Sequence, residues 1–245
     1  MQDRRSPLFV AKALVAEKFS EAAAVFFAGS VVRGEASQFS DIDIVVVYDS
    51  IENAYRESFV YKDWPVEVFV HDMETIRYFL EVYDRDNGLP ELHQMLIEAL
   101  VLPEENDLSK ELKDKAAKIF ESGPPALEES QINLRKYRIS EILNDAKSPR
   151  GGEELLATLS KFYQEFTDFY FRSQGLWSAR GKAIPKRMKK IDSEFYKNFS
   201  SSYRKAVESG DVGHLVQACE SFMGHPGGYF EGFREDAPSD WRIKS

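Results

Sequence analysis

The spacing of apolar residues changes along the chain, from strand-like runs before residue 72 to helical repeats after it. Residues 8–19 are an exception at the start, because their apolar positions recur at the spacing of one helical face. The segments AAVFF and IDIVVVY are short, apolar and bounded by polar or turn-forming residues, which is typical of buried strands. The segment YRESFVYKDWPVEVFV holds two further strand-like runs, and residues 62–65 between them predict the turn of a hairpin.

After Asp72, which is a suitable helix N-cap, apolar residues recur at helical spacing almost to the end of the chain. The helices predicted from this pattern span residues 73–85, 91–101, 108–121, 128–146, 153–173, 185–208 and 211–223. Strands followed by helices predict an α+β fold, in which a small mixed β-sheet domain precedes an α-helical bundle. We place the boundary in LVLPEEND, so that the two domains span residues 1–102 and 103–245. The closing segment GGYFEGFREDAP has no assigned role, and a docked tail is the one interpretation considered for it.

Composition favours a soluble globular protein of the cytoplasm. Of the 245 residues, 43% are hydrophobic and 30% are charged, and a disordered chain would be poorer in hydrophobic residues. No apolar run approaches the length that spans a membrane, and Lys12 and Glu17 interrupt the first apolar segment before it could act as a secretory signal. The single cysteine, Cys219, excludes an intramolecular disulfide and fits a reducing compartment.

The net charge of −9 is concentrated in the first domain. Residues 1–102 carry 9 Lys and Arg against 18 Asp and Glu, a balance of −9, whereas residues 103–245 carry 23 of each, a balance of 0. An acidic surface repels a nucleic-acid backbone and attracts metal ions and cationic molecules. We therefore expect a cation at the first domain, and we expect neither a nucleic acid nor a membrane as partner.

Three acidic residues of the strand region predict a metal site. Asp41 and Asp43 are two residues apart at the start of a strand, so their side chains project to the same side and repel each other unless a cation lies between them. Oxygen ligands of this kind suit Mg²⁺, which also binds substrate phosphates. Glu67 alternates with valines on what we expect to be a neighbouring antiparallel strand, and it could complete the site as a metal ligand or as a general base. Asp72 is a weaker candidate for this third role, because a helix cap already accounts for it.

A phosphate-binding turn is predicted just before the two aspartates. Gly29 and Ser30 follow the first strand; glycine lets a phosphate approach the backbone, and the N–H groups and the serine hydroxyl can donate to its oxygens. Arg33 is a further candidate ligand. Lys182 lies in RGKAIPKRMKK, residues 180–190, which holds six basic residues and no acidic one, and we expect it to supply counter-charge to a triphosphate. The rest of this segment is interpreted as a solvated helix face.

These residues together resemble the signature of the polymerase-beta-type nucleotidyltransferase superfamily. The matching residues are Gly29-Ser30, Gly34 and Ser40-Asp41-Ile42-Asp43, with Glu67 as the third carboxylate, all within residues 26–70. The length and the helical C-terminal half are similar to those of bacterial aminoglycoside nucleotidyltransferases of the kanamycin type. The resemblance implies transfer of a nucleoside monophosphate, usually from ATP, to a hydroxyl group, with two Mg²⁺ ions and release of pyrophosphate. The acidic first domain favours a small, hydroxylated and polycationic acceptor.

Two other functions are kept open. One is nucleotidylation (AMPylation) of a macromolecule, either a protein or the end of a tRNA, which the basic segment 180–190 supports and the acidic first domain opposes. The other is a nucleotide-binding module without turnover. Such a module is expected to have lost one of the three carboxylates, and this chain has all three. We expect the chain to act as a monomer or a homodimer.

Overall fold

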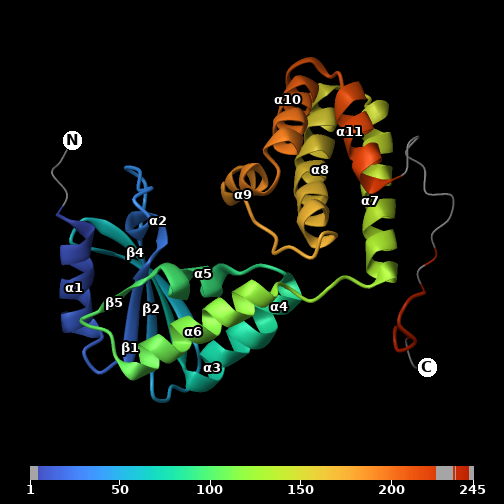
Figure 1. Ribbon diagram of the computed structural model, residues 1–245. Helices are drawn as coiled ribbons and strands as arrows, with labels where there is room; N and C mark the ends of the chain where they lie inside the picture. The colour runs from blue at the N-terminus through green and yellow to red at the C-terminus, as the bar shows by residue number, and fades with distance from the viewer. Residues whose placement is uncertain (1–4, 225–233, 235, 243–245) are drawn as a thin grey trace. The chain divides into compact units, whose positions relative to one another are not determined.

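The computed structural model of the protein forms two compact units, Met1–Pro125 and Ala126–Ser245 (Figure 1). The structure describes residues 5–224, 234 and 236–242. Each unit has a hydrophobic core of its own. The order of a mixed sheet followed by helices confirms the α+β fold that the sequence predicts.

The first unit contains a five-stranded mixed sheet with the strand order β3-β4-β2-β1-β5. The strands are β1 (Ala24–Ala28), β2 (Ile42–Tyr48), β3 (Tyr55–Tyr61), β4 (Trp64–Asp72) and β5 (Leu100–Leu102). Strands β2 and β4 pair in parallel, whereas the other neighbours are antiparallel. The antiparallel pairing expected between β2 and β4 is therefore wrong. Strand β3 lies at the outer edge of the sheet, and the hairpin from β3 to β4 places β4 between β3 and β2. Strand β4 therefore runs in the same direction as β2.

Both faces of the central strands are buried. Val25 and Phe27 of β1 pack in one core with α1 (Pro7–Lys18), whereas Phe26 packs in the opposite core with α5 (Glu91–Glu98) and α6 (Asp107–Ser122). Figure 1 shows where these helices lie around the sheet. Burying such a side chain completely contributes roughly 1.5–3 kcal/mol. A strand covered on both faces needs apolar residues at consecutive positions, which is why β1 and β2 are continuous apolar runs in the sequence.

The hairpin between β3 and β4 turns on two residues. Lys62 and Asp63 have φ angles of 46° and 69°, and a two-residue type I′ turn requires positive φ at both positions. Trp64 and Pro65, which the sequence assigns to the turn, already belong to β4. The turn is therefore tighter than predicted.

The helical segment after β4 begins at the predicted cap. The Asp72 carboxylate accepts the N–H of Thr75 at 2.9 Å, and the Thr75 hydroxyl accepts the N–H of Asp72 at 2.9 Å. The Thr75 hydroxyl also donates to the carboxylate at 2.8 Å, and the two hydrogen bonds that Thr75 donates, from its N–H and its hydroxyl, lower the pKa of the Asp72 carboxyl. The segment continues without interruption through α3 (Met73–Tyr78), a π-helical turn η1 (Phe79–Tyr83) and α4 (Asp84–Asn87).

The end of the first unit departs from the prediction in two ways. The helix predicted at 91–101 ends at Glu98, and Leu100–Leu102 pairs with β1 as an edge strand. Helix α6 then packs Leu112 and Ala116 into the core of the sheet. The compact first unit consequently extends to Pro125, beyond the domain boundary placed at residue 102.

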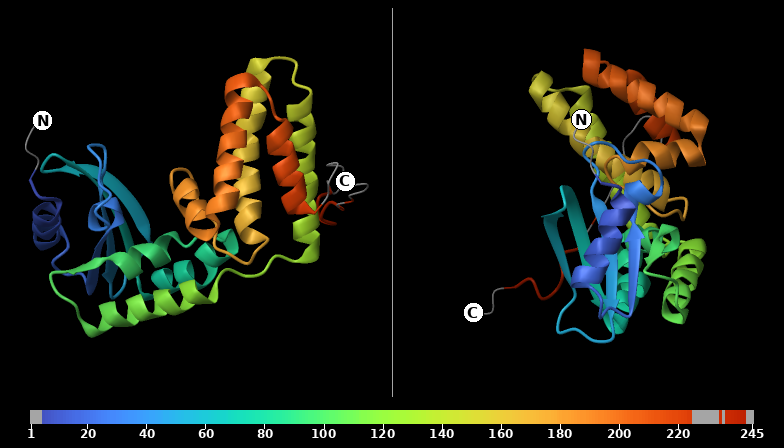
Figure 2. Two further views of the ribbon diagram at one scale, coloured as in Figure 1. Left: turned by 45° about the horizontal axis from the view of Figure 1, so that its top comes forward. Right: turned by 90° about the vertical axis from the view of Figure 1, so that its left-hand side faces the viewer.

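The second unit consists of α7 (Glu129–Lys147), α8 (Gly152–Arg172), α9 (Ala183–Ile191), α10 (Ser193–Ser209) and α11 (Gly213–Met223). Figure 2 shows α8 and α10 side by side, and between them Tyr170 and Phe195 stack with their ring centroids 4.8 Å apart. The single helix predicted for 185–208 is divided at Asp192, whose carboxylate caps α10 by accepting the N–H of Phe195 at 2.8 Å.

Across the described residues, no helix is long and apolar enough to cross a membrane. The docked tail expected at residues 227–238 lies largely outside the described residues.

Candidate active site

Three carboxylates meet at one end of the sheet. Asp41 directly precedes β2, Asp43 is the second residue of β2, and Glu67 lies opposite Asp43 on β4. One oxygen of each carboxylate lies within 4.8 Å of the others, and all three side chains are half-buried. Because β2 and β4 run in parallel, residues near the start of each strand reach the same edge. The structure thus brings together the three acids that the sequence singles out.

Gly29 lies against the same edge, at the turn from β1 into the short helix α2 (Gly29–Val32). Its φ of +83° falls in the left-handed region, and a Cβ placed on it would lie 1.9 Å from Oδ2 of Asp43. Side chains are therefore excluded twice, by the backbone conformation and by the carboxylate. The backbone turn at Gly29 therefore lies directly against one of the three carboxylates.

Ser30 anchors the loop that leads to the aspartates. Its hydroxyl donates to the Ser40 hydroxyl oxygen at 3.1 Å, and the same Ser40 oxygen accepts the N–H of Ser37 at 2.8 Å. Ser40 is buried. The predicted phosphate ligand therefore also holds the loop in place, and it links the glycine turn to the residue before Asp41.

Glu67 is held by two residues of β3 that the sequence pattern did not single out. Nε of Arg56 donates to Oε1 of Glu67 at 2.6 Å, Nη2 of Arg56 contacts the same oxygen, and the Ser58 hydroxyl donates to it at 3.2 Å. The Arg56 guanidinium also lies over the Phe69 ring, 5.4 Å from its centroid. The alternation of Arg56 and Ser58 on the strand predicted to pair with that of Glu67 was a usable signal.

The other predicted ligands are placed differently. Arg33 pairs with Glu35 at 3.1 Å and with Glu98 at 3.0 Å. Partial burial lowers its pKa, but the hydrogen bonds to Glu98 and Glu35 outweigh that effect, so the pKa is raised overall. These contacts favour a structural role for Arg33. Asp72 caps α3 at the far end of β4 from Glu67, and Lys182 is exposed in the second unit, at the N-cap of α9.

Among the residues that the structure describes, no histidine belongs to the carboxylate cluster. His71 is buried at the far end of β4, where its ring packs edge-on against Phe79 with the centroids 4.9 Å apart. Burial lowers the pKa of His71 to about 4, although the charges of Asp72 and Asp84 act to raise it. Nδ1 of His93 lies 3.1 Å from Oδ2 of Asp84 in the same core. Both histidines are thus part of the packing behind the sheet.

Comparison with known proteins identifies the family of the chain. The family model of the nucleotidyltransferase domain matches residues 11–146, which is more than half of the chain. The chain therefore belongs to the nucleotidyltransferase domain family, and nucleotidyl transfer is the general activity of its fold and site.

A solved structure with a similar chain is a nucleotidyltransferase-like protein from Exiguobacterium sibiricum 255-15, at 12% identity and a TM-score of 0.44. The alignment covers 89% of the present chain and 73% of that one. No curated protein matches the sequence.

Proposed function

We propose that the protein transfers a nucleoside monophosphate from ATP or another nucleoside triphosphate to a hydroxyl group of a small molecule, with release of pyrophosphate. The observation that carries this proposal is the cluster of Asp41, Asp43 and Glu67 directly beside the backbone turn at Gly29. Carboxylates and a phosphate-accessible backbone turn at one sheet edge are what a metal-bound triphosphate needs.

The donor set fits a divalent magnesium site. Three carboxylates within 4.8 Å of one another supply hard oxygen ligands, and without a cation they repel one another. Asp41, Asp43 and Glu67 would hold two Mg²⁺ ions, which when bound supply the positive charge that stabilises the attacking and leaving oxygens. Gly29 and Ser30 would receive the triphosphate through the backbone and the hydroxyl. The remaining contribution of the chain is to orient these groups.

Glu67 acts in this proposal as a metal ligand. Oε1 of Glu67 already accepts hydrogen bonds from Arg56 and Ser58. An oxygen bonded to a guanidinium is poorly suited to take up a proton from an attacking hydroxyl, whereas such a contact orients a carboxylate toward a cation. The contacts therefore support the ligand role over the general-base role that the sequence leaves equally open.

The acceptor in this proposal is a small, hydroxylated and cationic compound, of which an aminoglycoside is the example that the family resemblance suggests. Residues 1–125 carry 13 Lys and Arg against 24 Asp and Glu, a balance of −11, which attracts a polycation and repels a polyanion. The test is a pyrophosphate-release screen of amino-sugar and polyhydroxy compounds with each nucleoside triphosphate. Turnover with cationic acceptors, abolished by Asp43→Asn, supports the proposal, and release that needs no acceptor contradicts it.

A macromolecular acceptor is the second candidate, and the basic segment 180–190 is the observation that favours it. Incubation with labelled ATP and mass spectrometry of proteins and RNA would detect it. Label on a macromolecule, together with no turnover in the small-molecule screen, would replace the first candidate.

Lys182 is proposed as a ligand of the triphosphate from the second unit. Its side chain is exposed and the site needs counter-charge. Lys182→Ala should weaken ATP binding about tenfold, the loss of one charge-assisted contact. Lys161→Ala, which removes an equally exposed cation from α8, is the control; equal effects of the two variants would assign Lys182 to the solvated surface.

A further inference from the structure

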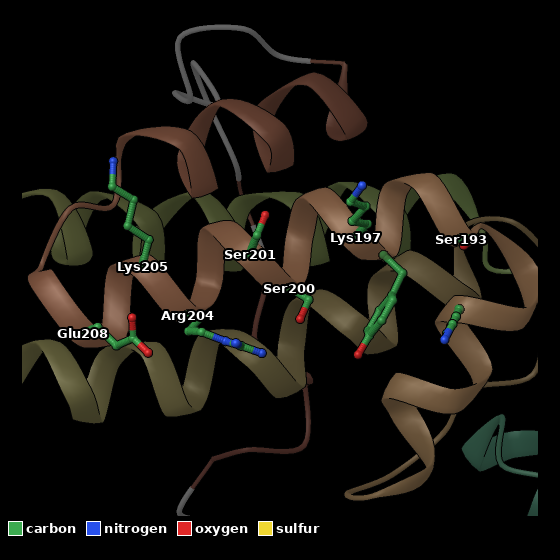
Figure 3. Close-up of a pocket in the computed structure, with 9 residues that line it drawn as sticks. Ser193, Lys197, Ser200, Ser201, Arg204, Lys205 and Glu208 are labelled. Carbon is green, nitrogen blue, oxygen red and sulfur yellow. The ribbon is translucent and has the colours of Figure 1, made fainter.

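The second unit carries a concentration of positive charge, of which the proposed transfer reaction uses Lys182 alone. Residues 180–205 hold nine Lys and Arg against two Asp and Glu, a balance of +7 in a chain whose net charge is −9. Part of this charge lines a groove of about 530 Å³ along α10, beside Lys189 of α9. Figure 3 shows the α10 side chains of this groove.

The groove is lined by cations and hydroxyl groups. Lys189, Lys197 and Arg204 are exposed, and within the described part of the chain none of them has a carboxylate at ion-pair distance. Lys205 differs, because it pairs with Asp211 at 2.6 Å. Between the cations lie the hydroxyls of Ser193, Tyr196, Ser200 and Ser201, and Glu208 lies at one end. Such a lining suits phosphate groups.

The cations are spread out and do not converge on one point. Lys197 and Arg204 are seven residues apart on one helix, which places them roughly 10 Å apart along its axis. Figure 3 shows Lys197 extending from one side of α10 and Arg204 from the other, with Ser200 and Ser201 between them. A single phosphate group would need donors directed at one place. A nucleic-acid strand carries phosphates at regular intervals, so it matches donors that are separated along the groove.

The rest of the groove favours a nucleic-acid strand over a lipid surface. Tyr196 contributes a ring to the lining, and an aromatic ring beside a basic groove allows a base to stack. The apolar face of α10 is already used, since Phe199 and Ala206 are buried in the core of the bundle. The helix therefore has no free apolar face to insert into a bilayer.

We propose that the groove of α9 and α10 binds a single-stranded nucleic acid, with Lys189, Lys197 and Arg204 contacting its phosphates. The inference concerns the second unit alone and does not depend on the transfer reaction. It revises the expectation that nucleic acid is not a partner, which rests on the acidic surface of the first unit.

The test is fluorescence anisotropy of the full chain with a labelled single-stranded RNA of about 15 nucleotides. The triple variant Lys189→Gln, Lys197→Gln, Arg204→Gln should weaken binding at least about tenfold at about 50 mM salt, because three phosphate contacts are lost. The slope of log affinity against log salt should become shallower by about 2, that is roughly 0.7 for each phosphate. The matched control is Lys12→Gln, Lys110→Gln, Lys161→Gln, which removes three exposed cations elsewhere and should change affinity less than about twofold.

Four outcomes would overturn the proposal. They are equal losses in the two triple variants, no binding by the unaltered chain, displacement of the RNA by pyrophosphate at matched phosphate concentration, and binding to phosphatidylglycerol vesicles but not to RNA. If the triple variant fails to fold, Lys197→Gln and Arg204→Gln alone carry the test. Each should then weaken binding about threefold, and unchanged affinity in both would also refute the proposal.

Discussion

At the level of single residues, the site depends on how closely Gly29 approaches Asp43. The backbone at Gly29 is left-handed, and the space for a side chain is filled by the Asp43 carboxylate. A replacement must therefore strain the backbone and move Asp43, a proposed metal ligand, at once. The chain also contains Gly34, which has a φ of +70° but no atom within 4 Å of the position that a Cβ would occupy, so the two effects can be separated.

Gly29→Ala should abolish divalent-ion binding, whereas Gly34→Ala should preserve it. Gly34→Ala should lose roughly 1–2 kcal/mol of stability, the cost of a left-handed alanine, and Gly29→Ala should lose more because its methyl group also clashes with Asp43. Mn²⁺ binding followed by electron paramagnetic resonance, together with the thermal midpoint of each variant, checks the prediction. Loss of Mn²⁺ binding in both variants would show that backbone strain alone, without the contact to Asp43, disrupts the site.

Arg56→Met should weaken Mn²⁺ binding by at least about tenfold, the usual effect of losing a partner that orients a metal ligand. The direction of the change in Mn²⁺ affinity distinguishes an orienting role of Arg56 from a purely electrostatic one, because removing a positive charge would by itself strengthen the binding of a cation. Arg56 is 64% exposed, so its charge is screened and the orienting contact should dominate.

Arg56→Lys should recover part of the affinity, and Lys62→Met on the same hairpin is the control for charge. Tighter Mn²⁺ binding by Arg56→Met would mean that Arg56 opposes the metal and does not position Glu67. The KM for Mg²⁺ should rise in Arg56→Met in parallel with the loss of Mn²⁺ affinity, which a general loss of folding would not produce.

At the level of elements, the end of β4 is packed against the π-helical turn η1 through His71. The His71 side chain is 4% exposed, and its ring lies edge-on to Phe79. Because burial holds the pKa of His71 at about 4, below the ordinary value of 6.5, the folded protein keeps this ring neutral where the unfolded chain already binds a proton.

Stability should consequently fall as the pH is lowered from 6.5 to about 4. The contribution of His71 is fully present above pH 6.5, and its complete loss below pH 4 amounts to about 3 kcal/mol, from 1.36 kcal/mol for each pKa unit. Urea unfolding at several pH values, compared between the unaltered chain and His71→Leu, isolates this contribution from that of the carboxylates. Parallel pH dependences in the two proteins would show that His71 does not titrate in this window.

At the level of the whole molecule, we expect the acidic charge of the first unit to make nucleotide binding depend on a divalent cation. Its balance of −11 and the three adjacent carboxylates oppose a triphosphate. ATP should bind at least about tenfold more tightly with Mg²⁺ than without it, a difference of about 1.4 kcal/mol. Titration calorimetry in both conditions measures the ratio. Asp43→Asn should reduce it while leaving the fold intact, and an equal affinity with and without Mg²⁺ in the unaltered chain would contradict the assignment of the site.

Local sequence patterns were sufficient to predict the elements whose residues allow only one kind of secondary structure. The continuous apolar run of β2 required burial on both faces, and Asp72 with Thr75 formed the cap expected at the start of α3. Local patterns failed at Leu100–Leu102, because three apolar residues are compatible with a helix as well as with a strand. Pairing with the edge of β1 decides between the two, and this pairing cannot be seen in the local sequence. They also failed at Asp192, where one polar residue ends α9 and caps α10.

Sequence patterns were sufficient to select the residues that meet at the candidate site. Asp41 and Asp43 must share one side of a strand because side chains alternate along it, and Gly29 with Ser30 must form a turn after a buried strand. The tertiary structure alone decided how these groups meet. The parallel pairing of β2 with β4 sets Glu67 opposite Asp43, and the edge position of β3 sets Arg56 and Ser58 against Glu67. Strand order and direction depend on contacts between distant segments, for which no short stretch of sequence has a periodicity.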